Sequence, residues 1–158
     1  MQKLLLTLLC VLLTGFSFAQ KRKTIKKYNI RSVTTTEVTG NKTINDNKSV
    51  YDTKGRLIEE TNYDREGKFK SQFRYKYNMD DDLTEQCKYN EAGVLLEKMT
   101  VKYDVMGEKA EELVVDKNGK QVSRNVYTHN AKGLKTEKKQ FDAGNKLVSV
   151  KKYTYAYK

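Results

Sequence analysis

The chain has 158 residues, with 31 Lys or Arg against 20 Asp or Glu, so its formal net charge is +11 at pH 7. This length fits one domain, and a hydrophobic content of 37% is too low for a large core of several layers. Disordered chains lack aromatic residues, whereas 10% of this chain is aromatic, mostly Tyr. The composition therefore favours a thin folded sheet with one apolar face.

The first 19 residues have the pattern of a secretory signal peptide. Lys3 provides the positive start, residues 4–16 form an apolar run, and Ser17-Phe18-Ala19 fits the small-x-small rule for cleavage before Gln20. The run is shorter than the ~20 apolar residues that a membrane span requires. We therefore expect export to the periplasm, the outer surface or the medium, with no transmembrane segment after cleavage.

Residues 20–27 form a basic leader, which we expect to be either a flexible arm or a tail that contacts anions. Residues 28–38 are β-branched and rich in Thr, which predicts a strand, and residues 39–42 predict a turn. No helix is expected after the signal peptide. Residues 28–158 contain no Pro and no low-complexity break, so they are expected to form one β-repeat domain.

From residue 51 onward one phrase recurs: an aromatic residue, Asp or Asn, two variable positions, and Gly. The Asp or Asn can open a type I turn, and the Gly can adopt the left-handed conformation that closes it. Asp81 and Asn145 take the position of Gly in two copies. The copies alternate at intervals of about 12 and about 14 residues and begin at Asp52, Asp64, Asn78, Asn90, Asp104, Asp116, Asn130 and Asp142.

This spacing predicts an all-β protein, an antiparallel meander of about ten strands in a single twisted, curled sheet built from two-strand repeats of about 26 residues. Side chains alternate between the faces of a strand. Alternation pairs Tyr63 with Phe69 and Glu59 with Phe73 across one turn. Across the next turn it pairs Tyr77 with Leu83 and Phe73 with Cys87. The apolar residues then share one face, and the other face carries the basic residues Lys68, Lys70, Arg74, Lys76 and Lys88.

The basic face has two interpretations. It is either an ordinary solvated surface or a Coulombic surface for anionic glycans and other envelope polymers. Nucleic acid is not an expected partner, because the chain is expected to be exported and the aromatic rings would point away from these lysines.

A second candidate binding face follows the repeat on the expected aromatic side. It combines Tyr75 and Tyr77 with a row of carboxylates that could accept hydrogen bonds from sugar hydroxyls: Glu59, Glu85, Glu111 and Glu137. The simpler interpretation of the row is a solvated, repeat-encoded edge of the face.

The sequence contains no recognisable catalytic arrangement. The single histidine, His129, occupies the aromatic position of the repeat, and no Cys/His cluster has zinc-binding spacing. Cys87 is the only Cys after residue 19, so we expect no internal disulfide and a buried, inert thiol. We therefore expect neither enzymatic activity nor a metal or cofactor.

The segments YDTKGRLIEETNYDREGKFK and KYNEAGVLLEKMTVKYD resemble YD repeats of the RHS type, found in bacterial cell-surface and toxin-delivery proteins, and short exported proteins of Bacteroidetes that carry similar repeats. The resemblance covers about residues 51–158. It implies antiparallel β-ribbons that curl into a shell or spiral, with no catalytic residues. This chain is too short to enclose a toxin and lacks the family's terminal core and toxin region.

We therefore expect an exported, non-enzymatic repeat protein. Its expected role is that of a cell-envelope binding module for an anionic polymer or glycan. The alternative is a structural or protein–protein interaction scaffold.

Overall fold

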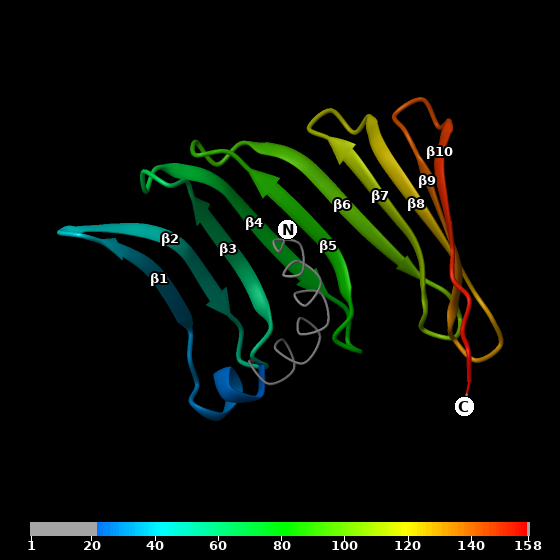
Figure 1. Ribbon diagram of the computed structural model, residues 1–158, viewed down its shortest axis with the longest axis horizontal. Coiled ribbons are helices and arrows are strands. Elements are labelled where there is room, and N and C mark those ends of the chain that lie inside the picture. The colour runs from blue at the N-terminus through cyan, green and yellow to red at the C-terminus, as the bar shows by residue number, and fades with distance from the viewer. Residues whose placement is uncertain (1–21, 158) are drawn as a thin grey trace, which may run out of the picture.

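The computed structural model describes residues 22–157, so the signal peptide predicted over residues 1–19 lies outside the described residues. Ten antiparallel strands form one sheet, in which each strand pairs with its neighbours in the sequence (Figure 1). The strands are β1 (Ser32–Thr39), β2 (Lys42–Tyr51), β3 (Leu57–Tyr63), β4 (Phe69–Tyr77), β5 (Leu83–Tyr89), β6 (Leu95–Tyr103), β7 (Lys109–Asp116), β8 (Gln121–His129), β9 (Lys135–Phe141) and β10 (Leu147–Lys152). The predicted single curled meander is confirmed, and β1 and β10 are its two edges.

The turns between β2 and β10 have the chemistry that the repeat predicts. In the turn that joins β3 to β4, the Gly67 N–H donates to the Asp64 carbonyl and the Asp64 N–H donates to the Lys68 carbonyl, both at 2.9 Å. The Asp64 side chain accepts two further backbone N–H bonds, from Glu66 at 2.8 Å and Lys68 at 3.0 Å. The glycines of this position have φ between 73° and 80°, in the left-handed region.

Asp81 and Asn145 stand where the other turns have Gly, and they adopt the same conformation, with φ of 70° and 61°. Asn and Asp are the residues that tolerate this region best after Gly. The turn geometry is therefore kept in all eight copies, with Asp81 and Asn145 accepting some backbone strain.

A bulge follows each of these turns and changes the pairing register. The predicted pairs Tyr63–Phe69 and Tyr77–Leu83 are confirmed. Beyond them the register shifts by one residue, so that Phe73 lies opposite Glu60 and Lys88. The predicted pairs of Phe73 with Glu59 and with Cys87 are therefore wrong. The unpaired residue is always the second of its strand, at Ile58, Lys70, Thr84, Leu96, Ala110, Val122, Thr136 and Val148.

The shifted register mixes the two predicted faces. Directly opposed residues share a face, so Glu59, Arg74 and Cys87 lie together on one side. We call this side the glutamate face, because it carries Glu59, Glu85, Glu111 and Glu137. We call the other side the tyrosine face, defined by Phe73, Tyr75, Lys88, Val101 and Tyr127. Neither face is purely apolar or purely basic.

Burial is shallow on both sides, as expected for a single layer. The buried strand residues include Tyr51, Cys87 and Val101 among the apolar ones and Ser49, Thr61 and Ser71 among the polar ones. The repeat is also held by tyrosine hydroxyls that donate to the first carbonyl of the preceding strand: Tyr77 to Leu57 at 2.7 Å, Tyr103 to Leu83 at 2.9 Å and Tyr155 to Lys135 at 2.8 Å.

Residues 22–27 form a short helix, which corrects the expectation of a flexible arm and no helix. Its Ile25 is only 4% exposed. The helix lies close to the turn after β2, because a Cβ placed on Gly55 would come within 3.0 Å of the Arg22 carbonyl oxygen. In the part of the chain that the structure describes, no helix is long and apolar enough to cross a membrane.

Candidate functional site

The predicted basic face is divided between the two sides of the sheet. Arg74 and Lys76 lie on the glutamate face, opposite Cys87 and Glu85. Lys88 lies on the tyrosine face, opposite Phe73. The sequence therefore predicted a cluster that the structure does not bring together, because alternation without the bulge places all five basic residues on one side.

On the glutamate face the basic residues are paired with acids. Arg74 Nε lies 3.1 Å from Glu59 Oε2, and Glu85 is held by Lys76 Nζ at 2.8 Å and Lys98 Nζ at 2.6 Å. The two remaining members of the carboxylate row are also paired, Glu111 with Lys102 and Arg124, and Glu137 with Lys139. The row is thus a ladder of ion pairs, which link neighbouring strands at Glu59, Glu85 and Glu111 and lie within β9 at Glu137.

The ion pairs lower the pKa of two of these acids, Glu85 and Glu111. Hydrogen bonds from Lys76 and Lys98 lower the pKa of Glu85 to about 2. A hydrogen bond from Lys102 is the largest influence that lowers the pKa of Glu111. These carboxylates are therefore occupied by cations of the same sheet, which favours the structural interpretation of the row.

The second candidate face is also separated by the register. Tyr75 lies on the tyrosine face, where its hydroxyl donates to Glu60 Oε2 at 3.2 Å rather than meeting Glu59. Burial and the adjacent Glu60 carboxylate raise the pKa of Tyr75. Tyr77 stacks beneath the Arg56 guanidinium, 4.9 Å from its ring centroid. The predicted combination of Tyr75 and Tyr77 with the glutamate row is therefore wrong.

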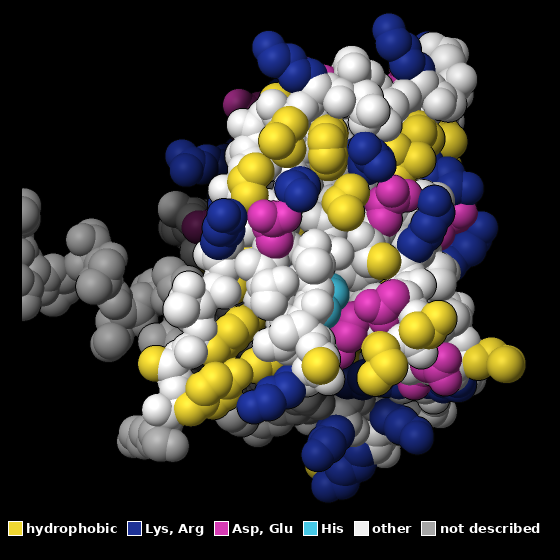
Figure 2. All heavy atoms as spheres, turned by 90° about the vertical axis from the view of Figure 1, so that its right-hand side faces the viewer, with side chains coloured by type: hydrophobic (Ala, Val, Ile, Leu, Met, Phe, Trp, Pro, Cys, Tyr) yellow, Lys and Arg dark blue, Asp and Glu magenta, His cyan; other side chains and the backbone are white. Residues whose placement is uncertain are grey.

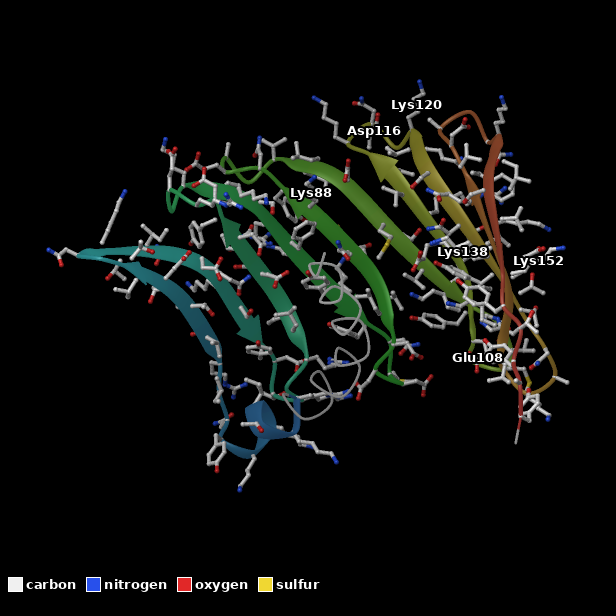
Figure 3. The ribbon with its side chains drawn as sticks, viewed as in Figure 1. Lys88, Glu108, Asp116, Lys120, Lys138 and Lys152 are labelled. Carbon is white, nitrogen blue, oxygen red and sulfur yellow. The ribbon has the colours of Figure 1, made fainter. Side chains whose placement is uncertain are left out.

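A hollow on the tyrosine face brings two of the predicted lysines together. It has a volume of about 590 Å³ and is lined by Asp46, Asn62, Tyr63, Lys70, Ser71, Phe73 and Lys88. Lys70 is the bulged residue of β4. Lys88, which is labelled in Figure 3, comes from the adjacent strand β5. Bulges re-aim side chains, and this one turns Lys70 toward the hollow.

The two lysines of the hollow differ from the other basic residues of the predicted patch. Within residues 22–157, Lys70 makes no ion pair shorter than 4.0 Å, and Lys88 has only one long contact, 3.9 Å to Glu97. Lys68, by contrast, sits in the exposed turn and pairs with Glu66 at 2.6 Å. In the hollow, therefore, two of the predicted basic residues have ammonium groups without a close acidic partner in the sheet, and these can bind an anionic ligand.

An aromatic residue lies beside one of these lysines. Phe73 lines the same hollow and lies opposite Lys88, so the expectation that the aromatic side chains all point away from the basic residues is wrong. Sequence reasoning did not include Asn62 or Ser71, which add an amide and a hydroxyl. No sequence signal pointed to them, because Asn62 comes to lie opposite Ser71 only through the bulge at Lys70, which no residue type marks.

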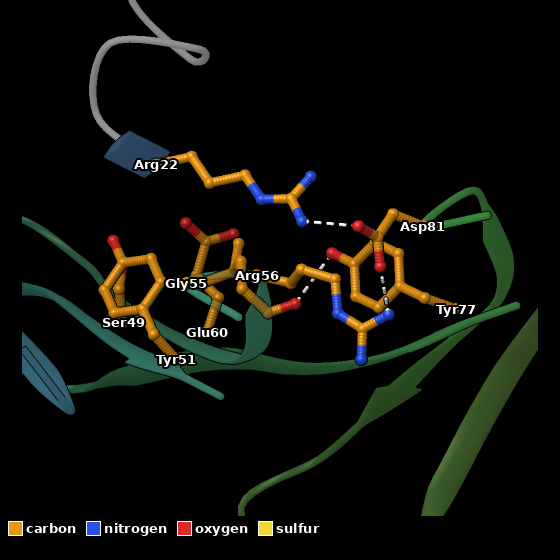
Figure 4. A pocket seen from close by; sticks show the side chains of 9 residues that line it. Arg22, Ser49, Tyr51, Gly55, Arg56, Glu60, Tyr77 and Asp81 are labelled. Atoms are coloured by element: carbon orange, nitrogen blue, oxygen red, sulfur yellow. Dashed lines mark hydrogen bonds and ion pairs between the residues drawn. The ribbon is translucent and has the colours of Figure 1, made fainter. Parts of the chain in front are cut away.

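A separate cavity of about 300 Å³ lies between the helix and the first strands (Figure 4). Asp81 closes it, accepting Arg22 Nη2 at 2.7 Å, Arg56 Nη1 at 2.8 Å and Lys54 Nζ at 3.3 Å. The hydrogen bond from Arg22 is the largest of the effects that lower the pKa of Asp81 to about 2. The one Asp among the expected glycines thus anchors the helix to the turn after β4.

Comparisons with known proteins give no family assignment. No family model matches the chain, and no curated protein matches it. A porin-like protein from Bacteroides uniformis is 11% identical over 69% of each chain, with a TM-score of 0.34. TarM is 14% identical over 80% of this chain and 22% of its own, with a TM-score of 0.29. TcdB2-TccC3-TEV is 11% identical over 77% of this chain and 10% of its own, with a TM-score of 0.26.

Proposed function

We propose that the protein is an exported, non-enzymatic binding module for anionic glycans or related envelope polymers, and that the hollow around Lys70 and Lys88 is its binding site. One observation supports this most: two lysines with little or no internal pairing share a hollow with aromatic, amide and hydroxyl groups. The basic residues of the opposite face are already neutralised by the glutamate row.

The chemistry of the hollow fits a charged sugar. Phe73 lies directly opposite Lys88, so the phenyl ring and the lysine side chain are neighbours on one face. A sugar ring can place its C–H face on the phenyl ring while its carboxylate or sulfate accepts from the lysine. Lys70 lies three residues from Phe73 along β4, about 10 Å at the rise of a strand. A chain of sugars with repeated anionic groups can therefore contact both lysines.

The binding is expected to be weak and sensitive to salt. Both lysines lie at the surface, where an ion pair contributes ~1 kcal/mol or less. Screening acts over about 8 Å at physiological ionic strength. Affinity should therefore come from several charged units along one polymer.

The experiment is retention of the exported protein on immobilised heparin and on polygalacturonate. The Lys70→Glu, Lys88→Glu double variant should elute at clearly lower salt. Its matched control is Lys117→Glu, Lys120→Glu, which changes the net charge equally at the exposed turn after β7 (Lys120 is labelled in Figure 3). The control should elute near the wild-type position. An equal loss of retention in both variants would show that only net charge matters, and it would contradict the proposal.

A third variant separates a sugar from a bare polyanion. Phe73→Leu keeps an apolar side chain but removes the ring. It should weaken retention on polygalacturonate while leaving binding to polyphosphate unchanged. If both ligands bind Phe73→Leu as they bind the wild type, the aromatic ring has no part in recognition and the glycan assignment fails.

A further inference from the structure

The outer edge of β10 is open and unusually apolar for a sheet edge. Among residues 22–157, β10 pairs with β9 on one side and with no strand on the other. Leu147, Val148 and Val150 are 45%, 53% and 43% exposed. Hydrophobic side chains reach the surface on this side of the molecule (Figure 2). Exposed apolar edge strands are templates for pairing with another chain.

The other edge, β1, differs from β10 in charge. Within Ser32–Thr39 the only charged residue is Glu37, and the rest are Ser, Thr and Val. β10 contains Lys151 and Lys152 and no acid. The two edges are therefore complementary in charge.

The repeat also makes the two edges compatible in geometry. Strands alternate in direction along the sheet, so β1 and β10 run in opposite directions. A β1 strand from a second copy, placed beside β10, continues the antiparallel alternation without turning either molecule over. The two-strand unit supplies the register. β10 corresponds to β4, shifted by about three repeats of 26 residues, and β2 corresponds to β6, shifted by about two. Thr35 lies opposite Asn47 as Gln86 lies opposite Met99, so β1 corresponds to β5 with an offset of one residue at the bulge of Asp46.

We infer that copies of this chain join head to tail, with β1 of one copy adding to β10 of the next. In β4–β5, Phe73 lies opposite Lys88. The corresponding positions set Lys151 opposite Glu37 of the second copy, on the tyrosine face that both residues share. Directly opposed side chains on a sheet lie within reach of one another.

Such an interface is heterologous, because two different surfaces meet. It leaves a free β1 at one end and a free β10 at the other, so addition continues beyond a dimer unless the curvature closes a ring. The proposal is independent of the glycan-binding hollow, which involves β2 to β5 and neither edge.

The backbone offers a specific way to block the edge. The Tyr153 N–H donates inward to the Thr136 carbonyl at 3.0 Å. N–H groups alternate between the two sides of an antiparallel strand, so the Val150 N–H points outward. Val150→Pro removes that donor, and Pro is tolerated on an edge strand where its N–H would face solvent.

Sedimentation velocity of the exported protein over a range of concentrations tests the proposal. The wild type should form species larger than a dimer, whose share grows with concentration, and Val150→Pro should remain monomeric with an unchanged circular dichroism spectrum. Glu37→Lys should also weaken assembly, and Lys151→Glu in the same chain should restore it. The charge control is Glu66→Lys in an exposed turn, which should assemble as the wild type does.

Three results would overturn the proposal. One is a wild type that stays monomeric at all concentrations. Another is assembly that stops at a dimer and is unaffected by Glu37→Lys, which would indicate pairing of β10 with β10. The last is a Glu37→Lys, Lys151→Glu variant that assembles no better than Glu37→Lys alone.

Discussion

Replacing Glu85 by Gln tests the shifted register and the glutamate ladder together. In the structure Glu85 lies opposite Lys76 and accepts from both Lys76 and Lys98. In a sheet without the bulge, Glu85 would lie opposite Tyr75, with neither lysine beside it. The variant keeps the shape of the side chain and removes its charge, so its effect on stability reports the ion pairs.

The size of the effect follows from the pKa of Glu85. A fall from 4.5 to about 2 corresponds to about 3 kcal/mol of unfolding free energy. The Lys76 and Lys98 side chains are 74% and 38% exposed, so solvent screening reduces the expected loss to about 1 kcal/mol.

The effect should depend on pH with a definite sign. The pKa of Glu85 is lower in the folded chain than in the unfolded chain, so its ion pairs stabilise the fold above about pH 5. This stabilisation is lost as the pH falls toward 2, where Glu85 becomes protonated. Glu85→Gln should therefore differ most from the wild type at pH 7 and least at pH 2.

Urea denaturation at pH 7, 4 and 2 measures this difference. Glu91→Gln is the matched control, because Glu91 is exposed in the turn after β5. The control should follow the wild-type pH dependence. If Glu85→Gln and Glu91→Gln lose equally little stability and share one pH dependence, Glu85 is not held by lysines and the register is wrong.

Three further changes probe the repeat. Gly67→Val should lower the unfolding free energy in urea by about 2 kcal/mol or more, because φ is 77° there; wild-type stability would contradict the turn assignment. Asp81→Gly restores the repeat's own residue but removes the anchor of the helix, so hydrogen exchange should quicken in residues 22–27, and unchanged protection would refute that anchor. Tyr103→Phe deletes the hydrogen bond from the hydroxyl to the Leu83 carbonyl and should lower the unfolding free energy by about 1 kcal/mol in the same urea assay. An unchanged unfolding free energy would show that this hydrogen bond does not stabilise the repeat.

The turns could be predicted because their chemistry is local. An Asp such as Asp64 and a Gly such as Gly67 determine a turn within four residues, and eight copies in register determine the meander. The strand order and the confirmed pairs next to each turn followed directly from that spacing. The residues that replaced Gly, Asp81 and Asn145, kept the conformation as the pattern required.

The bulges could not be predicted from residue type. The unpaired position is Ile58, Lys70 and Thr84 in β3, β4 and β5, with no Gly or Pro to mark it. A bulge adds twist to a strand, and its cost and gain depend on the whole curled sheet rather than on one side chain. The register error then moved Lys88 and Tyr75 to the wrong neighbours and divided both predicted binding surfaces.

The helix was missed for a related reason. Residues 22–27 are short and rich in Lys and Arg, which gives no helical periodicity of apolar residues. The helix is held by contacts distant in sequence, chiefly the Arg22–Asp81 ion pair and the burial of Ile25. The departure of Asp81 from Gly was visible in the sequence, but its partner lies 59 residues away.

The central claim is that an anionic glycan binds in the hollow on the tyrosine face. Its most direct test is a titration of the isotope-labelled protein with an oligogalacturonate, in which amide chemical shifts are measured. We predict the largest changes at Lys70, Ser71, Phe73 and Lys88, reduced by added salt. Changes centred instead on Arg74, Lys76 and the glutamate row, or no changes at saturating oligosaccharide, would contradict the account.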